Sequence, residues 1–236
     1  MKNKILIITQ THGNEIIGTE IMNKIRPNKR FRWIIVNKEA STKNKRFIKF
    51  DMNRIAPGNE GSKNYEQKRV AEIVSLAKKY KYTIDIHGTS ASSGIFTIVT
   101  NPTMQNILFA FSLPIKNIVI WGRKKTKGPI TRFASCGLEV ECGPQTSQKV
   151  KNKLRSILKD ITGQGINYNQ VNFEEKNIYK VYGKLLANKK TKKNTLKDFR
   201  KTMFNKETFY PLLCGQYKDF TCYKMDKINF VDLLSY

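Results

Sequence analysis

The chain has 236 residues, of which 44 are Lys or Arg and 18 are Asp or Glu, so its formal net charge is +26 at pH 7. This length allows one sizeable hydrophobic core, with room for a small second unit. No run of about 18 apolar residues is present, which argues against a transmembrane helix. The apolar run at 5–8 is too short for the core of a signal peptide. We therefore expect no membrane partner.

The positive charge is spread along the whole chain, from Lys2 to Lys227. The densest run, Lys189 to Lys193, contains no aromatic side chains on which bases could stack. This distribution favours a general compositional bias over a shaped basic surface, and nucleic-acid binding is a minor hypothesis. A positive surface would still attract small anions.

The four cysteines, at positions 136, 142, 214 and 222, include no Cys-x-x-Cys pair. In a chain of this length they do not make a disulfide framework. We therefore expect a protein of the reducing cytoplasm. A homo-oligomer is compatible with the sequence, which does not define the oligomeric state.

Strands alternate with helices in the first two thirds of the chain. A continuous apolar run predicts a buried strand at 5–9, and helical spacing of Ile residues predicts a helix at 15–25 that Pro27 ends. Further strands are predicted at 33–36, 82–86, 95–99, 118–121 and 138–140, and further helices at 65–80 and 146–161. This alternation indicates an α/β fold with a largely parallel sheet.

The chain changes character after about residue 167, where strands are predicted at 178–186 and 209–213 with a lysine-rich loop between them. Glycine and asparagine cluster at 163–169, which is typical of a linker. We therefore predict two domains, an α/β domain at 1–165 and a small, mostly β domain at 166–236.

The only two histidines each follow a predicted strand directly. His12 follows the strand at 5–9, with Glu15 in the same short stretch, and His87 follows the strand at 82–86. Ligands of α/β sheets bind at the carboxyl ends of strands, so these side chains are expected to converge. A catalytic zinc ion commonly takes three such ligands and leaves a fourth position for water. The pattern predicts one zinc ion per chain.

A general base for that water is predicted in the strand near residue 140. Glu139 and Glu141 are two positions apart, so in a strand they point to the same face. Gly143-Pro144 ends the strand, which leaves Glu141 near the mouth of a site. Ordinary surface ion pairs are the alternative for both glutamates. Cys142 alternates to the other face and is expected to pack in the core.

A partner that fixes the tautomer of His87 is also expected. Asp85 is a poor candidate for this partner, because it shares a face with His87 only if the strand persists to that point, and we leave the partner of His87 unassigned.

A basic loop supplies possible anion-binding groups. Arg46 and the segment Asp51-Met52-Asn53-Arg54 place guanidinium groups and an amide donor together. Arginine binds carboxylates through two parallel hydrogen bonds. A solvated surface charge is the alternative for each arginine taken alone.

Four ordered motifs together resemble the succinylglutamate desuccinylase and aspartoacylase family. They are Thr-His-Gly-Asn-Glu at 11–15, Asp-Met-Asn-Arg at 51–54, Asp-Ile-His-Gly-Thr at 85–89 and Glu-Val-Glu-Cys-Gly-Pro-Gln at 139–145. The resemblance implies a fold similar to zinc carboxypeptidases, with a mixed sheet flanked by helices. It also implies a zinc-dependent amidohydrolase that cleaves a small anionic N-acyl amino acid.

Carried over by position, the resemblance implies zinc ligands at His12, Glu15 and His87. Glu141 would be the catalytic carboxylate, which takes a proton from water. Arg46 would polarise the scissile carbonyl group.

The same resemblance implies a substrate-binding set. Asn53 and Arg54 match the pair that holds a substrate carboxylate in the family. Arg132 matches a further substrate-binding arginine, and Tyr217 corresponds to a tyrosine of the pocket contributed by the C-terminal part.

Two alternative hypotheses for the function remain. A zinc carboxypeptidase acting on peptides or cell-wall stem peptides would use the same ligands and the same glutamate. A non-catalytic basic binding protein would retain the fold without turnover.

Overall fold

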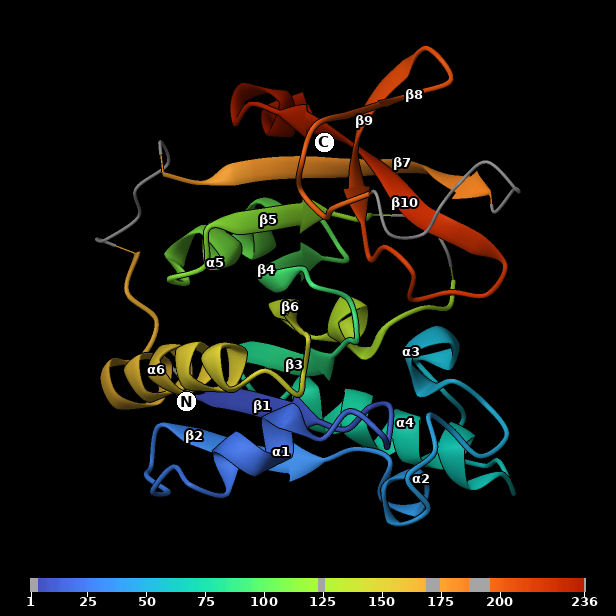
Figure 1. The fold of residues 1–236 in the computed structure, drawn as a ribbon. Helices are drawn as coiled ribbons and strands as arrows, with labels where there is room; N and C mark the ends of the chain where they lie inside the picture. The colour runs from blue at the N-terminus through green and yellow to red at the C-terminus, as the bar shows by residue number, and fades with distance from the viewer. Residues whose placement is uncertain (1–3, 123–125, 169–174, 187–195, 236) are drawn as a thin grey trace.

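The computed structural model describes residues 4–122, 126–168, 175–186 and 196–235. In this part of the chain, ten strands form one sheet in the order β2-β1-β3-β6-β4-β5-β7-β10-β9-β8 (Figure 1). The strands are β1 (Ile5–Thr9), β2 (Phe31–Ile35), β3 (Tyr82–Gly88), β4 (Gly94–Val99), β5 (Asn117–Ile120), β6 (Gly137–Gly143), β7 (Asn177–Leu186), β8 (Thr202–Phe204), β9 (Glu207–Leu212) and β10 (Phe220–Ile228).

The sheet is mixed. Strands β2, β1, β3 and β6 run parallel to one another, and β4 runs antiparallel to β6. β5 is parallel to both β4 and β7, whereas β10, β9 and β8 continue the sheet in antiparallel fashion. The expectation of a mixed α/β sheet flanked by helices is confirmed.

Helices cover both faces of the sheet. The described helices are α1 (Ile17–Met22), α2 (Lys38–Thr42), α3 (Met52–Ile55), α4 (Tyr65–Ala77), α5 (Met104–Ser112) and α6 (Gln148–Gln164), with short 3-10 turns η1 (Ile130–Phe133) and η3 (Val231–Ser235). One core cluster joins the sheet to α1, α5 and α6, and another joins it to α3 and α4. None of the helices in the described ranges is long and apolar enough to cross a membrane.

The position of β1 inside the sheet explains why its sequence is continuously apolar. Ile5 and Ile7 pack in the cluster with α1 and α6, whereas Leu6 and Ile8 pack in the cluster with α4. A strand buried on both faces needs apolar side chains at every position.

Several short elements were not predicted from the sequence. The loop after β2 contains α2 and α3, which begin at the capping residues Asn37 and Asp51, and α5 begins at the cap Thr103. Strands β8 and β10 were also missed. The first helix is shorter than the predicted range 15–25, because the Glu15 amide bonds to the His12 carbonyl in a turn before α1 begins.

The C-terminal strands extend the main sheet, since β7 pairs with β5. A third core cluster includes Phe96 and Ile98 of β4 together with Leu212, Phe220 and Tyr223 of the C-terminal part. The predicted division into domains 1–165 and 166–236 stays a prediction. The lysine run at 189–193 lies outside the described residues.

Candidate metal and substrate site

A tight turn after β1 presents His12 and Glu15. The Gly13 amide donates to the Arg46 carbonyl at 3.1 Å, so this turn lies directly against the loop after α2. A Cβ atom at Gly13 would lie 2.3 Å from the backbone carbon of Ala40. Only glycine allows the two backbones to approach this closely.

The Glu15 carboxylate lies between the two histidine rings. Its Oε1 is 2.8 Å from His12 Nδ1, and its Oε2 is 2.9 Å from His87 Nδ1. The Gly88 amide also donates to Oε2 at 3.1 Å. The three side chains are buried, and their ligand atoms lie within 4.8 Å of one another. This group can hold a metal ion.

Each histidine has a carboxylate at its other ring nitrogen. His12 Nε2 is 3.0 Å from Asp51 Oδ1, and His87 Nε2 is 3.1 Å from Asp85 Oδ2. The second contact lacks the alignment of a full hydrogen bond. A proton held on Nε2 by a carboxylate leaves the Nδ1 lone pair free for a metal. Both rings turn Nδ1 towards Glu15, the third member of the group that can hold a metal ion.

The view that Asp85 is a poor partner for His87 is wrong. It rested on the strand ending before His87, but β3 continues to Gly88. Asp85 and His87 therefore lie two positions apart on one strand and share a face. Asp85 is in turn fixed by the hydroxyl of Thr11, which donates to it at 2.9 Å.

The charges of this cluster stabilise one another. Burial disfavours ionisation of Glu15, but the two imidazole groups outweigh it and lower the pKa of Glu15 well below its usual range. Burial likewise lowers the pKa of His12 and of His87, but their carboxylate partners reverse this and raise both pKa values. The metal-free cluster thus favours the state with a charged carboxylate between the two rings.

Arg46 lies at the edge of the same cluster. Its Nη1 is 3.2 Å from Glu15 Oε1, its Nη2 is 2.8 Å from His12 Nε2, and the same Nη2 is 3.5 Å from Asp51 Oδ2. The side chain is 37% exposed, so it faces both the cluster and solvent. The structure therefore brings Arg46 to the predicted metal ligands.

Glu66 holds the loop that carries Arg46. The side chain is buried, and its two oxygens accept the backbone amides of Ile48, Lys49 and Phe50 at 2.6 to 2.7 Å. Asn37 Nδ2 donates to the same carboxylate at 3.0 Å. One buried side chain of α4 thus fixes the path of the chain from Arg46 towards Asp51.

Strand β6 places two glutamates on the same face. Leu138, Val140 and Cys142 point into the core cluster of α1, α5 and α6, as expected for Cys142. Glu139 and Glu141 alternate to the other face and line a cavity. Their strand ends at Gly143, as the sequence suggested.

Glu141 lies beside the group formed by His12, Glu15 and His87. It is the register partner of His87 across β3 and β6. Burial, together with the negative charges of Glu15 and Glu139, raises its pKa to about 7, against the opposing effect of His87. A carboxyl group with this pKa can accept and return a proton near neutral pH.

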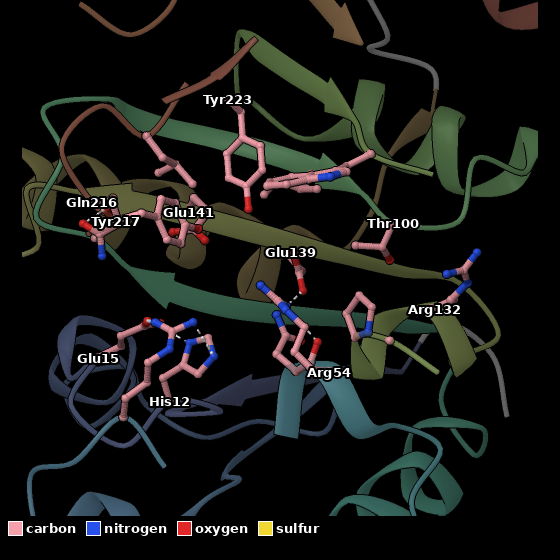
Figure 2. A pocket seen from close by; sticks show the side chains of 18 of the residues that line it. His12, Glu15, Arg54, Thr100, Arg132, Glu139, Glu141, Gln216, Tyr217 and Tyr223 are labelled. Atoms are coloured by element: carbon pink, nitrogen blue, oxygen red, sulfur yellow. Dashed lines mark hydrogen bonds and ion pairs between the residues drawn. The ribbon is translucent and has the colours of Figure 1, made fainter. Parts of the chain in front are cut away.

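A cavity of about 770 Å³ joins these groups (Figure 2). It is lined by eight of the nine side chains predicted for the site, namely His12, Glu15, Arg46, Asn53, Arg54, Arg132, Glu141 and Tyr217. The ninth, His87, contacts Glu15 from behind the cavity wall. Figure 2 shows Arg132 across the cavity from His12 and Glu15.

A family of catalytic domains matches most of this chain. The family described as the succinylglutamate desuccinylase/aspartoacylase catalytic domain matches residues 1–162. The chain belongs to this family. The matched segment contains all four motifs that the sequence analysis identified.

Two relatives illustrate the likeness. A probable aspartoacylase of Acaryochloris marina is 25% identical over 162 residues, which cover 60% of this chain and 55% of that protein. The succinylglutamate desuccinylase of Pseudomonas putida is 26% identical over 152 residues, which cover 57% of this chain and 41% of that protein. The chain spans about half the length of the relatives it matches.

Solved structures share the fold over almost the whole chain. Murine aminoacylase 3 has a TM-score of 0.71 at 17% identity, covering 95% of each chain. The succinylglutamate desuccinylase of Chromobacterium violaceum has a TM-score of 0.70 at 14% identity, covering 97% of this chain and 85% of that chain. The expected fold class of the family is thus confirmed.

Residues beyond the segment matched to the family complete the cavity. Lys184 of β7, Tyr223 of β10 and the loop between β9 and β10 line it. In that loop, Gln216 Oε1 accepts the hydroxyls of Thr89 at 2.9 Å and Ser90 at 2.6 Å, which ties the loop to the end of β3. Tyr217 in the same loop stacks on Phe220 with ring centroids 4.3 Å apart.

Sequence reasoning missed several of these lining residues. Trp121, Lys184, Gln216 and Tyr223 carry no local motif. Trp121 directly follows β5, whereas the other three reach the cavity because the C-terminal strands join the sheet beyond β5. Asp51 and Asp85, in contrast, could have been identified from the sequence. Each stands inside a motif that was already recognised.

Proposed function

We propose that this chain is a zinc-dependent amidohydrolase that cleaves the amide bond of an N-acyl amino acid, in the manner of aspartoacylases and succinylglutamate desuccinylases. One observation carries the proposal: the buried group His12, Glu15 and His87 lies beside a cavity that Glu141 also lines. Membership of the family supports it. We place the activity in the cytoplasm.

The donor set fits one zinc ion per chain. Two imidazole nitrogens and a carboxylate are the ligands of many catalytic zinc sites. The carboxylates of Asp51 and Asp85 at the far ring nitrogens supply the outer support that such ligands usually have. When bound, zinc would polarise a carbonyl group and lower the pKa of water.

Glu141 would be the general base. Its carboxylate would take a proton from the attacking water and later deliver that proton to the leaving nitrogen of the amide. Burial with a pKa of about 7 suits both steps, because the group changes protonation state near neutral pH.

Arg46 would stabilise the negative charge that develops on the amide oxygen. Its guanidinium group lies at the edge of the metal cluster, partly exposed, where it has donors beyond those that contact Glu15. Removal of one such donor typically lowers the rate about 100- to 1000-fold.

Asn53, Arg54 and Arg132 would hold the substrate. Arg54 lies in the cavity with its Nη1 bound to the Asn53 carbonyl at 2.9 Å, which fixes the guanidinium plane. A carboxylate held here positions the amide over the metal cluster. Tyr217 forms part of the wall on the β10 side.

The test is amine release from a panel of N-acetyl, N-succinyl and N-formyl amino acids and short peptides, with added zinc and with a chelator. We expect chelator-sensitive turnover of an acyl amino acid, lost in Glu141→Gln with zinc content retained. The matched control is Glu72→Gln, a half-exposed glutamate of α4 outside the cavity, which should retain turnover.

Other results would redirect the assignment. Turnover of peptides alone would favour a zinc carboxypeptidase. Absence of turnover together with tight, salt-sensitive nucleic-acid binding would favour a basic binding protein.

A further inference from the structure

Glu139 is a second buried carboxylate in the cavity, and the proposed hydrolysis does not use it. It is 5% exposed, and it lines the same cavity as Glu141. Its Oε1 is 3.8 Å from His87 Nε2, too far for a hydrogen bond. Figure 2 shows it between Arg54 and the wall that carries Tyr223.

Asn53 is fixed by this carboxylate. Its Nδ2 donates to Glu139 Oε1 at 2.8 Å. The opposite orientation of the amide would place two acceptors against each other, so the hydrogen bond defines which end of Asn53 faces Glu139. Asn53 Oδ1 is then left buried without a hydrogen-bond partner among the described residues.

The Glu139 carboxylate and Asn53 Oδ1 therefore form a pair of hydrogen-bond acceptors beside the cavity. Burial and the charge of Asp85 raise the pKa of Glu139, against the opposing effects of His87, Asn53 and Arg54. A ligand that donates hydrogen bonds and carries positive charge would satisfy both Glu139 and Asn53 Oδ1. An ammonium group has three N–H donors and no acceptor.

We propose that Glu139 and the side-chain oxygen Oδ1 of Asn53 form an ammonium subsite beside Arg54, so that the substrate is an acylated diamino acid. This inference rests on the proposed function, which it narrows to one substrate class. Arg54 would bind the carboxylate of the substrate and Glu139 its free amine. A purely acidic acyl amino acid would place a second negative charge near Glu139.

Two arrangements of the substrate share this chemistry. In one, the acyl group is on the α-nitrogen and the side chain carries the ammonium. In the other, the acyl group is on the side-chain nitrogen and the α-amine is free. Nα-acetyl-L-ornithine and Nδ-acetyl-L-ornithine distinguish them.

The kinetic test uses the zinc-loaded full chain with these two compounds and Nα-acetyl-L-norleucine, whose side chain matches ornithine in length but lacks the amine. We expect kcat/KM for one ornithine compound to exceed that for the norleucine compound about 10- to 100-fold, as one charge-assisted hydrogen bond supplies. In Glu139→Gln, kcat/KM for the ornithine compound should fall at least 10-fold more than kcat/KM for the norleucine compound. Glu72→Gln is the control for loss of one negative charge.

Equal turnover of the ornithine and norleucine compounds by the wild type would overturn the proposal. So would a Glu139→Gln variant that loses activity on all substrates equally, because Glu139 would then only orient Asn53.

A binding measurement separates this inference from the proposed function. Calorimetry with L-ornithine and L-norleucine, both products of the proposed reaction, needs no turnover. Ornithine binding that weakens about 10-fold or more in Glu139→Gln would support the subsite even if no acyl compound is hydrolysed. Ornithine binding of unchanged affinity in Glu139→Gln would overturn it.

Discussion

Asp85 Oδ2 lies 3.1 Å from His87 Nε2, on the side of the ring away from Nδ1, which contacts Glu15. We predict that Asp85→Asn lowers zinc affinity about 10- to 100-fold, because a ligating histidine loses the carboxylate that fixes its tautomer. Competition with a chromophoric chelator measures the dissociation constant.

The control for this variant is Asp160→Asn, which removes an exposed carboxylate of α6. Thermal unfolding of both metal-free variants shows whether the fold is retained. An Asp85→Asn protein that folds and binds zinc as tightly as the wild type would show that the contact has no role in ligation.

Glu141 makes the metal-free protein less stable as the pH rises. Its pKa is about 7 in the folded state against an ordinary value of 4.5, mainly because of burial. The folded state therefore holds a proton that the unfolded state releases between pH 4.5 and 7, so stability falls as the pH increases through this window. The total loss across this window is on the order of 3 kcal/mol.

We predict that Glu141→Gln raises the melting temperature of the chelator-treated protein at pH 8 and leaves it little changed at pH 4.5. The glutamine resembles the protonated carboxyl group and avoids the cost of a buried charge. Thermal unfolding across this pH range gives the difference, and a constant offset at all pH values would rule out the titration as its cause.

The candidate site residues at the ends of β1, β3 and β6 were predictable from the sequence, because each of them follows or ends an apolar run. His12, His87 and Glu141 were found in this way, and the structure brings them to one place. The same local pattern predicts the strand register only up to the strand end. For that reason the continuation of β3 to Gly88 was missed, and with it the contact between Asp85 and His87.

The rest of the cavity depends on long-range pairing that no local pattern encodes. Tyr223 and Lys184 reach it because β10 and β7 pair with each other and β7 joins β5. Tyr217 was found only through the family resemblance. Glu139 was placed on the correct face by strand alternation, but its bond to Asn53 requires α3, which a search for long periodic segments does not detect.

Gly13 is required by the close approach of its turn to α2. An added Cβ would lie 2.3 Å from backbone atoms of Ala40 and Ser41, which cannot move as a side chain can. We predict that Gly13→Ala lowers the free energy of unfolding by about 1–3 kcal/mol through overpacking. Zinc affinity should fall as well, because the same turn presents His12 and Glu15.

The matched substitution is Gly163→Ala in α6, where an added Cβ meets no atom within 4 Å. Alanine is the better helix former there, so stability should rise by about 0.5–1 kcal/mol. Urea unfolding compares the two variants. Changes of the same sign in both would show that the contact with α2 does not decide the effect.

Glu66 is predicted to position Arg46 without touching the substrate. Its carboxylate accepts the amides of Ile48, Lys49 and Phe50, and glutamine keeps the size but loses the charge and offers fewer acceptor sites. We predict that Glu66→Gln lowers the free energy of unfolding by about 2 kcal/mol. Amide hydrogen exchange should become faster at residues 46–51 and stay unchanged in β6.

If Arg46 acts on the reacting carbonyl, a loosened loop should lower kcat more than it raises KM, since the guanidinium group stabilises charge that develops during the reaction. Arg46→Lys in the wild-type background gives the reference for loss of that group alone. A Glu66→Gln protein with faster exchange at 46–51 but unchanged kcat would show that the reaction does not depend on a fixed Arg46.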